Sequence, residues 1–267
     1  MRLDDLIRGI LVARGLSRRD LLRVGGVGGA LLALNQFGLG ADEAKPAKGK
    51  SRMSIQSAVD HLLLGVADLD AGIAWVEKKT GVRAIVGGSH PGVGTRNALL
   101  ALGKNQYLEI VAPDPAQKDY NFHIDVRKLT EPRLITWAAL SREIQKLAEQ
   151  ARAAGFQLFG PSDGSRVRPD GKQLRWKTLG VISKVETQSP SEVLPIPFFI
   201  EWATDSPHPA QDAPKGCELV QFEIEHPKPD SVRDSLRTLG LESTPTTGKA
   251  TRLIATMTTP KGKVTLS

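Results

Sequence analysis

The chain of 267 residues contains one cysteine, Cys217. A single cysteine excludes an intramolecular disulfide and any zinc site built from several thiolates. No histidine motif surrounds Cys217, which favours an apolar packing role over that of a nucleophile. The sequence also lacks the GxSxG, P-loop and HExxH motifs of several large enzyme classes. Candidate chemistry is therefore sought among the histidines and acidic residues.

Aromatic residues are also scarce, at 5% of the chain, although the net charge is +7. The positive charge is unevenly placed, and no basic stripe interleaved with aromatic residues is present. Such a stripe is typical of nucleic-acid-binding surfaces. We therefore expect no nucleic acid among the partners of this protein.

The N-terminal residues 1–40 have the features of an export signal. Arg18 and Arg19 form a twin-arginine pair, and residues 24–39 are weakly apolar and diluted by glycine. That stretch is short for a membrane span, and small residues at 40–41 offer a cleavage site. The segment resembles a twin-arginine signal, which directs folded proteins out of the bacterial cytoplasm. We expect recognition by the twin-arginine translocation machinery, a periplasmic or secreted protein, and no stable membrane span after signal cleavage.

Two other interpretations of this segment stay open. One is an amphipathic N-terminal helix with a chance arginine pair, and the other is a signal retained uncleaved as a membrane anchor. Residues 41–54 are polar and rich in lysine, which predicts a flexible leader. The folded part is therefore expected to begin at Ile55.

From Ile55 onward, strand and helix patterns repeat in one order. Apolar alternation predicts a strand, a helix follows with Asp68 as its cap and Gly81 as its stop, and three strands complete the unit. A looser second round and a partial third round follow. The first round contains strands 60–66, 82–88, 98–103 and 106–113 and helix 68–81. The second contains strand 134–140, helix 141–155, two strands within 156–181 around a polar Asp-Gly turn, and last strand 196–205. The third contains strand 217–226, helix 229–240 and hairpin 251–267.

A single βαβββ unit leaves one face of its sheet uncovered, so two such units are expected to pair. We predict an α+β fold in which residues 55–205 form two βαβββ modules, with a cupped mixed sheet and helices outside. Residues 206–267 are expected to form a trailing partial module packed on the same fold. The concave side of such a cup is a natural small-molecule site.

Four stretches in this order resemble the glyoxalase-like domain of the vicinal oxygen chelate (glyoxalase/bleomycin resistance/dioxygenase) superfamily: DHLLLGVADLDAGIAW, GGSHPGVGTRNALLALG, YLEIVAPDP and PFFIEW. The resemblance covers roughly residues 57–205. It implies that inward-facing residues on the first and last strand of each module hold a divalent metal, which binds vicinal oxygens of a substrate. Members include isomerases, dioxygenases, epimerases, thiol transferases and non-catalytic binding proteins.

Strand alternation places one candidate ligand among apolar neighbours on each of three strands: His61, Glu109 and Glu201. A carboxylate in such a place is costly unless it is paired or bound to a metal. These three residues would suit a first-row divalent ion (Zn, Ni, Mn or Fe) with open positions for water and substrate. A structural histidine and solvent-facing glutamates are the alternative.

The strand at residues 134–140, LITWAAL, offers no histidine or carboxylate where the resemblance implies a fourth ligand. Three possibilities follow. Three ligands suffice, or a residue from elsewhere completes the set, or the protein binds no metal.

The glycine-rich stretch SHPGVGTRN is the second candidate element of the site. His90 could act as acid or base, because histidine titrates near neutral pH. Thr95 and Asn97 could hydrogen-bond a substrate oxygen, and Tyr107 shares the inward face with Glu109. The alternative is a tight loop whose glycines serve backbone geometry and whose histidine is solvated.

The sequence therefore predicts an exported protein that performs metal-assisted lyase or isomerase chemistry on a small oxygen-rich molecule. In this hypothesis His61, Glu109 and Glu201 bind the metal, and Glu201 and His90 move protons. A non-catalytic small-molecule-binding protein that uses the same cup is the first alternative, and a non-haem metal dioxygenase is the second. A homodimer is compatible with all three.

Overall fold

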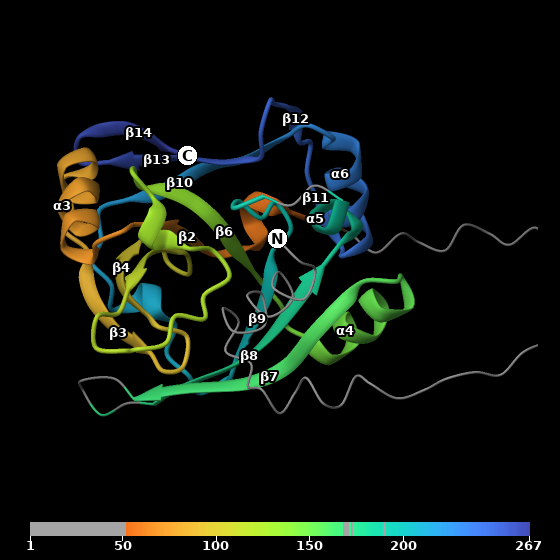
Figure 1. The fold of residues 1–267 in the computed structure, drawn as a ribbon, viewed down its shortest axis with the longest axis horizontal. Helices are drawn as coiled ribbons and strands as arrows, with labels where there is room; N and C mark the ends of the chain where they lie inside the picture. Colours follow the sequence, from red (N-terminus) through yellow and green to blue (C-terminus); the bar gives the residue numbers. More distant parts are fainter. Residues whose placement is uncertain (1–51, 168–170, 172, 189–190) are drawn as a thin grey trace, which may run out of the picture.

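Two βαβββ modules build one eight-stranded sheet, as the repeat pattern predicts (Figure 1). The structure is a computed structural model that describes residues 52–167, 171, 173–188 and 191–267. The predicted export signal lies outside the described residues, as does most of the predicted leader. The first module contains β2 (Val59–Gly65), α3 (Leu69–Thr80), β3 (Ile85–His90), β4 (Thr95–Ala101) and β5 (Tyr107–Pro113), and the second contains β6 (Arg133–Leu140), α4 (Ile144–Ala153), β7 (Gln157–Val167), β8 (Gln173–Ile182) and β9 (Phe198–Trp202).

The strand order repeats from one module to the other. The order across the sheet is β3-β4-β5-β2-β6-β9-β8-β7. The first strands of the two modules, β2 and β6, pair antiparallel at the centre, and each is parallel to the last strand of its own module. The strands β3 and β7 therefore form the two edges of the sheet. The sheet is curled, as in the vicinal oxygen chelate fold, and this confirms the predicted fold class.

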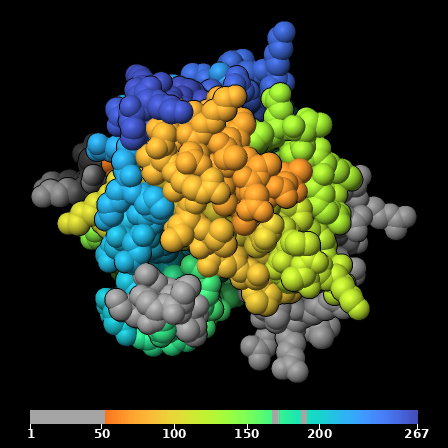
Figure 2. Space-filling model, turned by 90° about the vertical axis from the view of Figure 1, so that its left-hand side faces the viewer, coloured from red at the N-terminus to blue at the C-terminus, as the bar shows by residue number. Residues whose placement is uncertain are grey.

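The helices cover the outer face of the sheet. The side chain of Asp68 caps α3 by accepting a hydrogen bond from the backbone N–H of Ala71 at 2.8 Å, and Gly81 ends the helix with φ of 81°. Leu69 and Ile73 of α3 pack in the same core as the outward-facing residues of β2. Figure 2 shows the opposite side of α3 (orange) at the molecular surface.

No helix among the described residues has the length and apolar character needed to cross a membrane. The longest, α3, has 12 residues. Two shorter helices, α2 (Ile55–Ala58) and α5 (Lys184–Gln188), flank the modules.

The trailing residues form a second sheet with the order β12-β10-β13-β14. This sheet packs on the outer face of the larger one, where Phe222 of β10 meets Trp137 of β6 at 5.1 Å between ring centroids. Both sheets contribute to one apolar core. The elements are β10 (Glu218–His226), α6 (Pro229–Thr238), β11 (Leu241–Glu242), β12 (Thr246–Thr247), β13 (Arg252–Thr259) and β14 (Gly262–Leu266).

Regular structure is present before Ile55, the predicted start of the fold. Met53 and Ser54, which were expected in the leader, form β1 (Met53–Ser54) and pair in parallel with β11. The backbone N–H of Met53 also donates to the carbonyl of Gly240 at 3.2 Å. Hydrogen bonds to the trailing module therefore fix these two residues.

Connecting segments close both ends of the cup. At one end, residues after β5 pack on the cup floor, and at the other end the 3-10 helix η3 (Pro209–Gln211) lies against β4. The first group contains Phe122, Ile124, Val126 and Leu129 against Leu63 and Val111, and the second contains Ala210 and Ala213 against Leu99, Ala101 and Tyr107.

Candidate active site

The concave face of the sheet encloses a cavity of about 490 Å³. Its two walls differ in chemistry, because the first module supplies most of the polar side chains and the second supplies most of the aromatic ones. The polar wall contains His61, His90, Thr95, Asn97 and Glu109, and the facing wall contains Leu174, Trp176, Thr178, Phe198, Ile200 and Trp202.

A β-bulge at the start of β2 sets the deepest part of this cavity. The register between β2 and β6 shifts between Val59 and His61. A bulge sets two successive residues against one on the partner strand, and it re-aims their side chains. Asp60, which is 1% exposed, accordingly lies beside the His61 ring instead of opposite it, with Oδ1 at 2.7 Å from Nδ1.

Three donors surround the carboxylate of Asp60. In addition to His61, the indole N–H of Trp202 donates to Oδ2 at 2.9 Å, and Nε2 of His208 lies 3.2 Å from the same oxygen. The backbone N–H of Ala210 donates to Nδ1 of His208 at 3.2 Å, so Nε2 is the nitrogen of His208 that carries the proton. Burial alone would raise the pKa of Asp60, but the hydrogen bonds from His208 and His61 outweigh it and lower the pKa from 3.8 to about 2.

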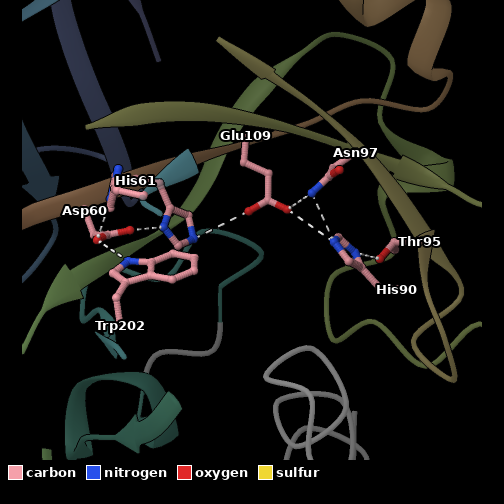
Figure 3. Close-up of polar contacts among 8 residues, drawn as sticks. Asp60, His61, His90, Thr95, Asn97, Glu109 and Trp202 are labelled. Atoms are coloured by element: carbon pink, nitrogen blue, oxygen red, sulfur yellow. Dashed lines mark hydrogen bonds and ion pairs between the residues drawn. The ribbon is translucent and has the colours of Figure 1, made fainter. Parts of the chain in front are cut away.

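An ionised Asp60 determines which His61 nitrogen faces the cavity. The carboxylate can only accept hydrogen bonds, so Nδ1 of His61 carries a proton and donates it. The other nitrogen, Nε2, is directed toward Glu109, at 3.5 Å from Oε2 (Figure 3). Tyr107 stacks on the imidazole with ring centroids 4.5 Å apart and an interplanar angle of 18°. The ring of His61 is therefore held by a hydrogen bond at one end and by packing on its face.

The two oxygens of Glu109 have different surroundings. Glu109 is 8% exposed, and its Oε1 accepts a hydrogen bond of 2.6 Å from Nδ2 of Asn97. The backbone N–H of Gly88 donates to Oδ1 of Asn97 at 2.9 Å, which fixes the orientation of the amide. Oε2 is the oxygen directed toward His61. One carboxylate oxygen is thus anchored while the other is available on the cavity side.

His90 lies on the far side of Glu109, with Nε2 at 3.4 Å from Oε1. The Asn97 amide donates to Nε2 of His90 at 3.1 Å, so Nδ1 carries the proton and contacts Oγ1 of Thr95 at 2.8 Å. Burial lowers the pKa of His90, the negative charge of Glu109 opposes this shift, and the positive charge of Arg166 adds to it. His90 is therefore neutral at pH 7.

Most of the predicted site residues come together. His61, His90, Thr95, Asn97, Tyr107 and Glu109 all line the cavity. The predicted loop around His90 is instead a tight hairpin, because His90 ends β3 directly opposite Thr95 of β4. The polar atoms of Thr95 and Asn97 bond to His90 and Glu109, so these two residues position neighbouring side chains.

The prediction that Glu201 faces the cup is wrong. Phe198, Ile200 and Trp202 of β9 line the cavity, and alternation along the strand directs Glu201 to the opposite face. There Oε2 of Glu201 accepts a hydrogen bond of 2.7 Å from the backbone N–H of Ile144. Glu201 thus caps the N-terminus of α4, where its negative charge also favours the helix dipole.

The cup residues do not fit the four-ligand metal set that the resemblance implies. Nε2 of His61 and Oε2 of Glu109 are two adjacent donors, but Glu201 faces away. On β6, Thr136 and Ala138 stand opposite Leu63 and His61 and provide no imidazole or carboxylate. In the described parts of the chain, no three His, Cys, Asp or Glu side chains are grouped so that they could hold a metal ion.

Four residues of the site were not predicted as such: Asp60, Trp202, His208 and Arg166. Asp60 directly precedes His61, and this adjacency was the signal available in the sequence. The bulge concealed it, because regular alternation directs neighbouring side chains to opposite faces.

A family model described as a glyoxalase-like domain matches residues 59–240, which include both modules and α6. The chain belongs to this family of glyoxalase-like domains. No curated protein matches this glyoxalase-like chain.

The solved structures to which the chain is similar are distant from it in sequence. The glyoxalase-like chain is similar to a hypothetical protein from Staphylococcus aureus, with a TM-score of 0.53 and 15% identity over 68% of this chain and 74% of that one. It is less similar to methylmalonyl-CoA epimerase from Mycobacterium tuberculosis, with a TM-score of 0.36 and 18% identity over 56% and 89% of the two chains. The similarity to methylmalonyl-CoA epimerase (E43L) from Streptomyces coelicolor has a TM-score of 0.41 and 17% identity, over 56% of this chain and 97% of that one. These likenesses concern the fold and carry no information on activity.

Proposed function

We propose that this glyoxalase-like protein is an enzyme, a lyase or isomerase, that moves a proton at a carbon next to a carbonyl group of a small molecule. The observation that supports the proposal is the row formed by Asp60, His61 and Glu109 at the floor of a concave, largely apolar cup. Such a row combines a proton acceptor with a hydrogen-bond donor of fixed orientation.

Glu109 is the proposed base. Asn97 holds Oε1 at 2.6 Å, so Oε2 keeps a fixed direction toward the cavity. A positioned carboxylate in an apolar pocket is a suitable acceptor for a proton from carbon, because water does not compete for it.

His61 is the proposed partner of the carbonyl oxygen. Asp60 binds Nδ1 at 2.7 Å, and this bond directs Nε2 into the cup. When Nε2 is protonated in addition to Nδ1, so that the ring carries a positive charge, Nε2 can donate to the oxygen on which negative charge develops as Glu109 removes the proton from carbon. Return of the proton from Glu109 to a neighbouring atom completes an isomerisation. Departure of a group from the next carbon completes a lyase reaction.

A metal-assisted version of this reaction is what the resemblance implies. The cup provides two adjacent donors where the implied set has four, so the proposal assigns proton transfer to the side chains themselves. Treatment with a chelator separates the two versions, because activity carried by side chains alone survives it.

Deuterium exchange tests the proposal directly. Phenylpyruvate and 3-methyl-2-oxobutanoate, an aromatic and a branched 2-oxo acid, are incubated in D₂O with the protein, and ¹H NMR follows loss of the proton next to the carbonyl. Wild-type protein should accelerate exchange over a protein-free control, with and without EDTA, and Glu109→Gln should not. Equal exchange by wild type and Glu109→Gln would refute the assignment of the base.

A binding protein is the second candidate. One observation favours it: Oε1 of Glu109 and Nε2 of His90 already have partners within the protein, in the amide of Asn97. The cup could therefore hold a ligand without reacting with it. Calorimetric binding of either oxo acid with no accelerated exchange would support this candidate over the enzyme.

We also propose export by the twin-arginine route, because Arg18 and Arg19 form a twin-arginine pair in the sequence. Fractionation of a bacterial host with this pathway tests it. Wild-type protein should reach the periplasm or the medium, whereas the double variant Arg18→Lys, Arg19→Lys should stay in the cytoplasm. Equal distribution of the two forms would contradict the proposal.

A further inference from the structure

Arg166 of β7 spans the open side of the cup. The edge strands β3 and β7 approach each other at this point, where the carboxyl end of β7 runs below β3 (Figure 1). Nη1 of Arg166 lies so close to β3 that a Cβ atom on Gly88 would be 3.1 Å from it, and one on Gly87 would be 3.4 Å from it. The two glycines therefore leave the space in which the guanidinium lies.

The charge of Arg166 has no partner among the described residues. Its neighbour on β8, Arg175, shows the contrast, because it forms an ion pair with Asp205. The described cavity lining contains two acidic residues, and each has other partners. Asp163 pairs with Lys177 at 2.6 Å, and Glu109 binds Asn97.

The guanidinium is half-buried and close to the polar wall of the cup. Burial lowers the pKa of His90, and the positive charge of Arg166 adds to this shift; burial raises the pKa of Tyr107, and the same charge opposes that shift. An unpaired, partly desolvated cation in such a place attracts an anion, and the planar fork of arginine matches a carboxylate.

We propose that Arg166 binds a carboxylate of the substrate, so that the cup selects small monocarboxylates with an apolar or aromatic body. This proposal rests on the proposed function, since it names the substrate class of the same site. The carboxylate would lie at the mouth on Arg166, and the apolar body would pack on the second-module wall, which includes Leu174 and Trp176. The carbonyl and the carbon that loses its proton lie between the carboxylate and the apolar body, and they would face His61 and Glu109 on the floor.

Calorimetry with matched pairs of ligands tests the assignment. The probes are 3-phenylpropanoate and 4-methylpentanoate, each compared with its neutral amide of the same shape. Wild-type protein should bind each carboxylate about tenfold more tightly than its amide, as for other hydrogen bonds to charged groups. In Arg166→Gln this preference should fall to about twofold or less, and in Arg166→Lys, which keeps the charge but loses the fork, it should be intermediate.

Arg175→Gln is the matched control, because it removes one arginine from the adjacent strand and should keep the wild-type preference. Thermal unfolding followed by circular dichroism establishes that each variant is folded. If Arg166→Gln is unfolded, the preference measured for Arg166→Lys decides the test. Retention of the full preference in the Arg166 variants, or its absence in the wild type, would overturn the proposal.

The same experiment separates this proposal from the function on which it rests. Glu109→Gln should keep the preference for carboxylates, because the anion lies on Arg166. If the wild-type protein prefers carboxylates but does not accelerate deuterium exchange, the proposed enzyme activity is refuted and the proposed carboxylate site at Arg166 is retained. If the wild-type protein accelerates exchange but binds carboxylate and amide equally well, the carboxylate site at Arg166 is refuted and the enzyme activity is retained.

Discussion

Replacing Asp60 with asparagine removes a buried negative charge that three donors share. The pKa of Asp60 is lowered from 3.8 to about 2, which corresponds to about 2 kcal/mol of folding free energy at neutral pH. The asparagine amide would also direct an N–H group at one of the present donors. We therefore expect Asp60→Asn to lower the free energy of unfolding by about 2 to 4 kcal/mol at neutral pH.

The loss of stability in Asp60→Asn should be larger at neutral pH than at acidic pH. A carboxyl whose pKa is depressed by folding stabilises the protein above its unfolded-state pKa, and the stabilisation is lost as the pH falls toward the folded-state value. The difference between wild type and Asp60→Asn should therefore shrink by about 1 kcal/mol between about pH 6 and about pH 3.

Urea unfolding followed by circular dichroism at these two pH values measures the difference. Asp68→Asn is the control, because Asp68 is an exposed helix cap and asparagine caps equally well. A difference of the same size at both pH values would refute the reasoning, as would full stability of Asp60→Asn.

Three further predictions concern other residues of the large sheet. Asn97→Asp places a second carboxylate next to Glu109. Like charges disfavour ionisation, so the pH profile of deuterium exchange should shift to higher pH by about one unit or more. An unchanged profile would argue against Glu109 as the base. Gly87→Ala would make Cβ overlap Oδ1 of Asn97, and urea unfolding should show a loss of about 1 to 3 kcal/mol. Glu201→Ala removes the cap on Ile144 and should cost about 1 kcal/mol in the same assay; full stability would contradict the capping role.

Much of the fold follows from local sequence pattern. Helix α3 begins and ends at its predicted cap and stop, Asp68 and Gly81, because side-chain capping and a left-handed glycine act within a single turn. His61 and Glu109 face the cup as predicted, since β2 and β5 are regular strands beyond the bulge and their alternation can be counted.

The errors have physical causes that alternation does not show. Strand β9 is apolar on both faces, because one face lines the cup and the other packs on the core through Phe199, so its sequence does not tell which face holds Glu201. Asp60 was missed because a register shift against β6 re-aims it. Arg166 was missed because its position depends on how far the sheet curls, which brings β7 near Gly88 of β3.

The rate of deuterium exchange in Glu109→Gln, compared with that in wild type and in Glu201→Gln, shows whether Glu109 is the base. Removal of a general base typically lowers a rate by about 10²-fold to 10⁴-fold. We predict a loss of about that size in Glu109→Gln and a rate within about twofold of wild type in Glu201→Gln, since Glu201 caps α4 on the other face of the sheet. Loss of exchange in Glu201→Gln with wild-type exchange in Glu109→Gln would contradict the account.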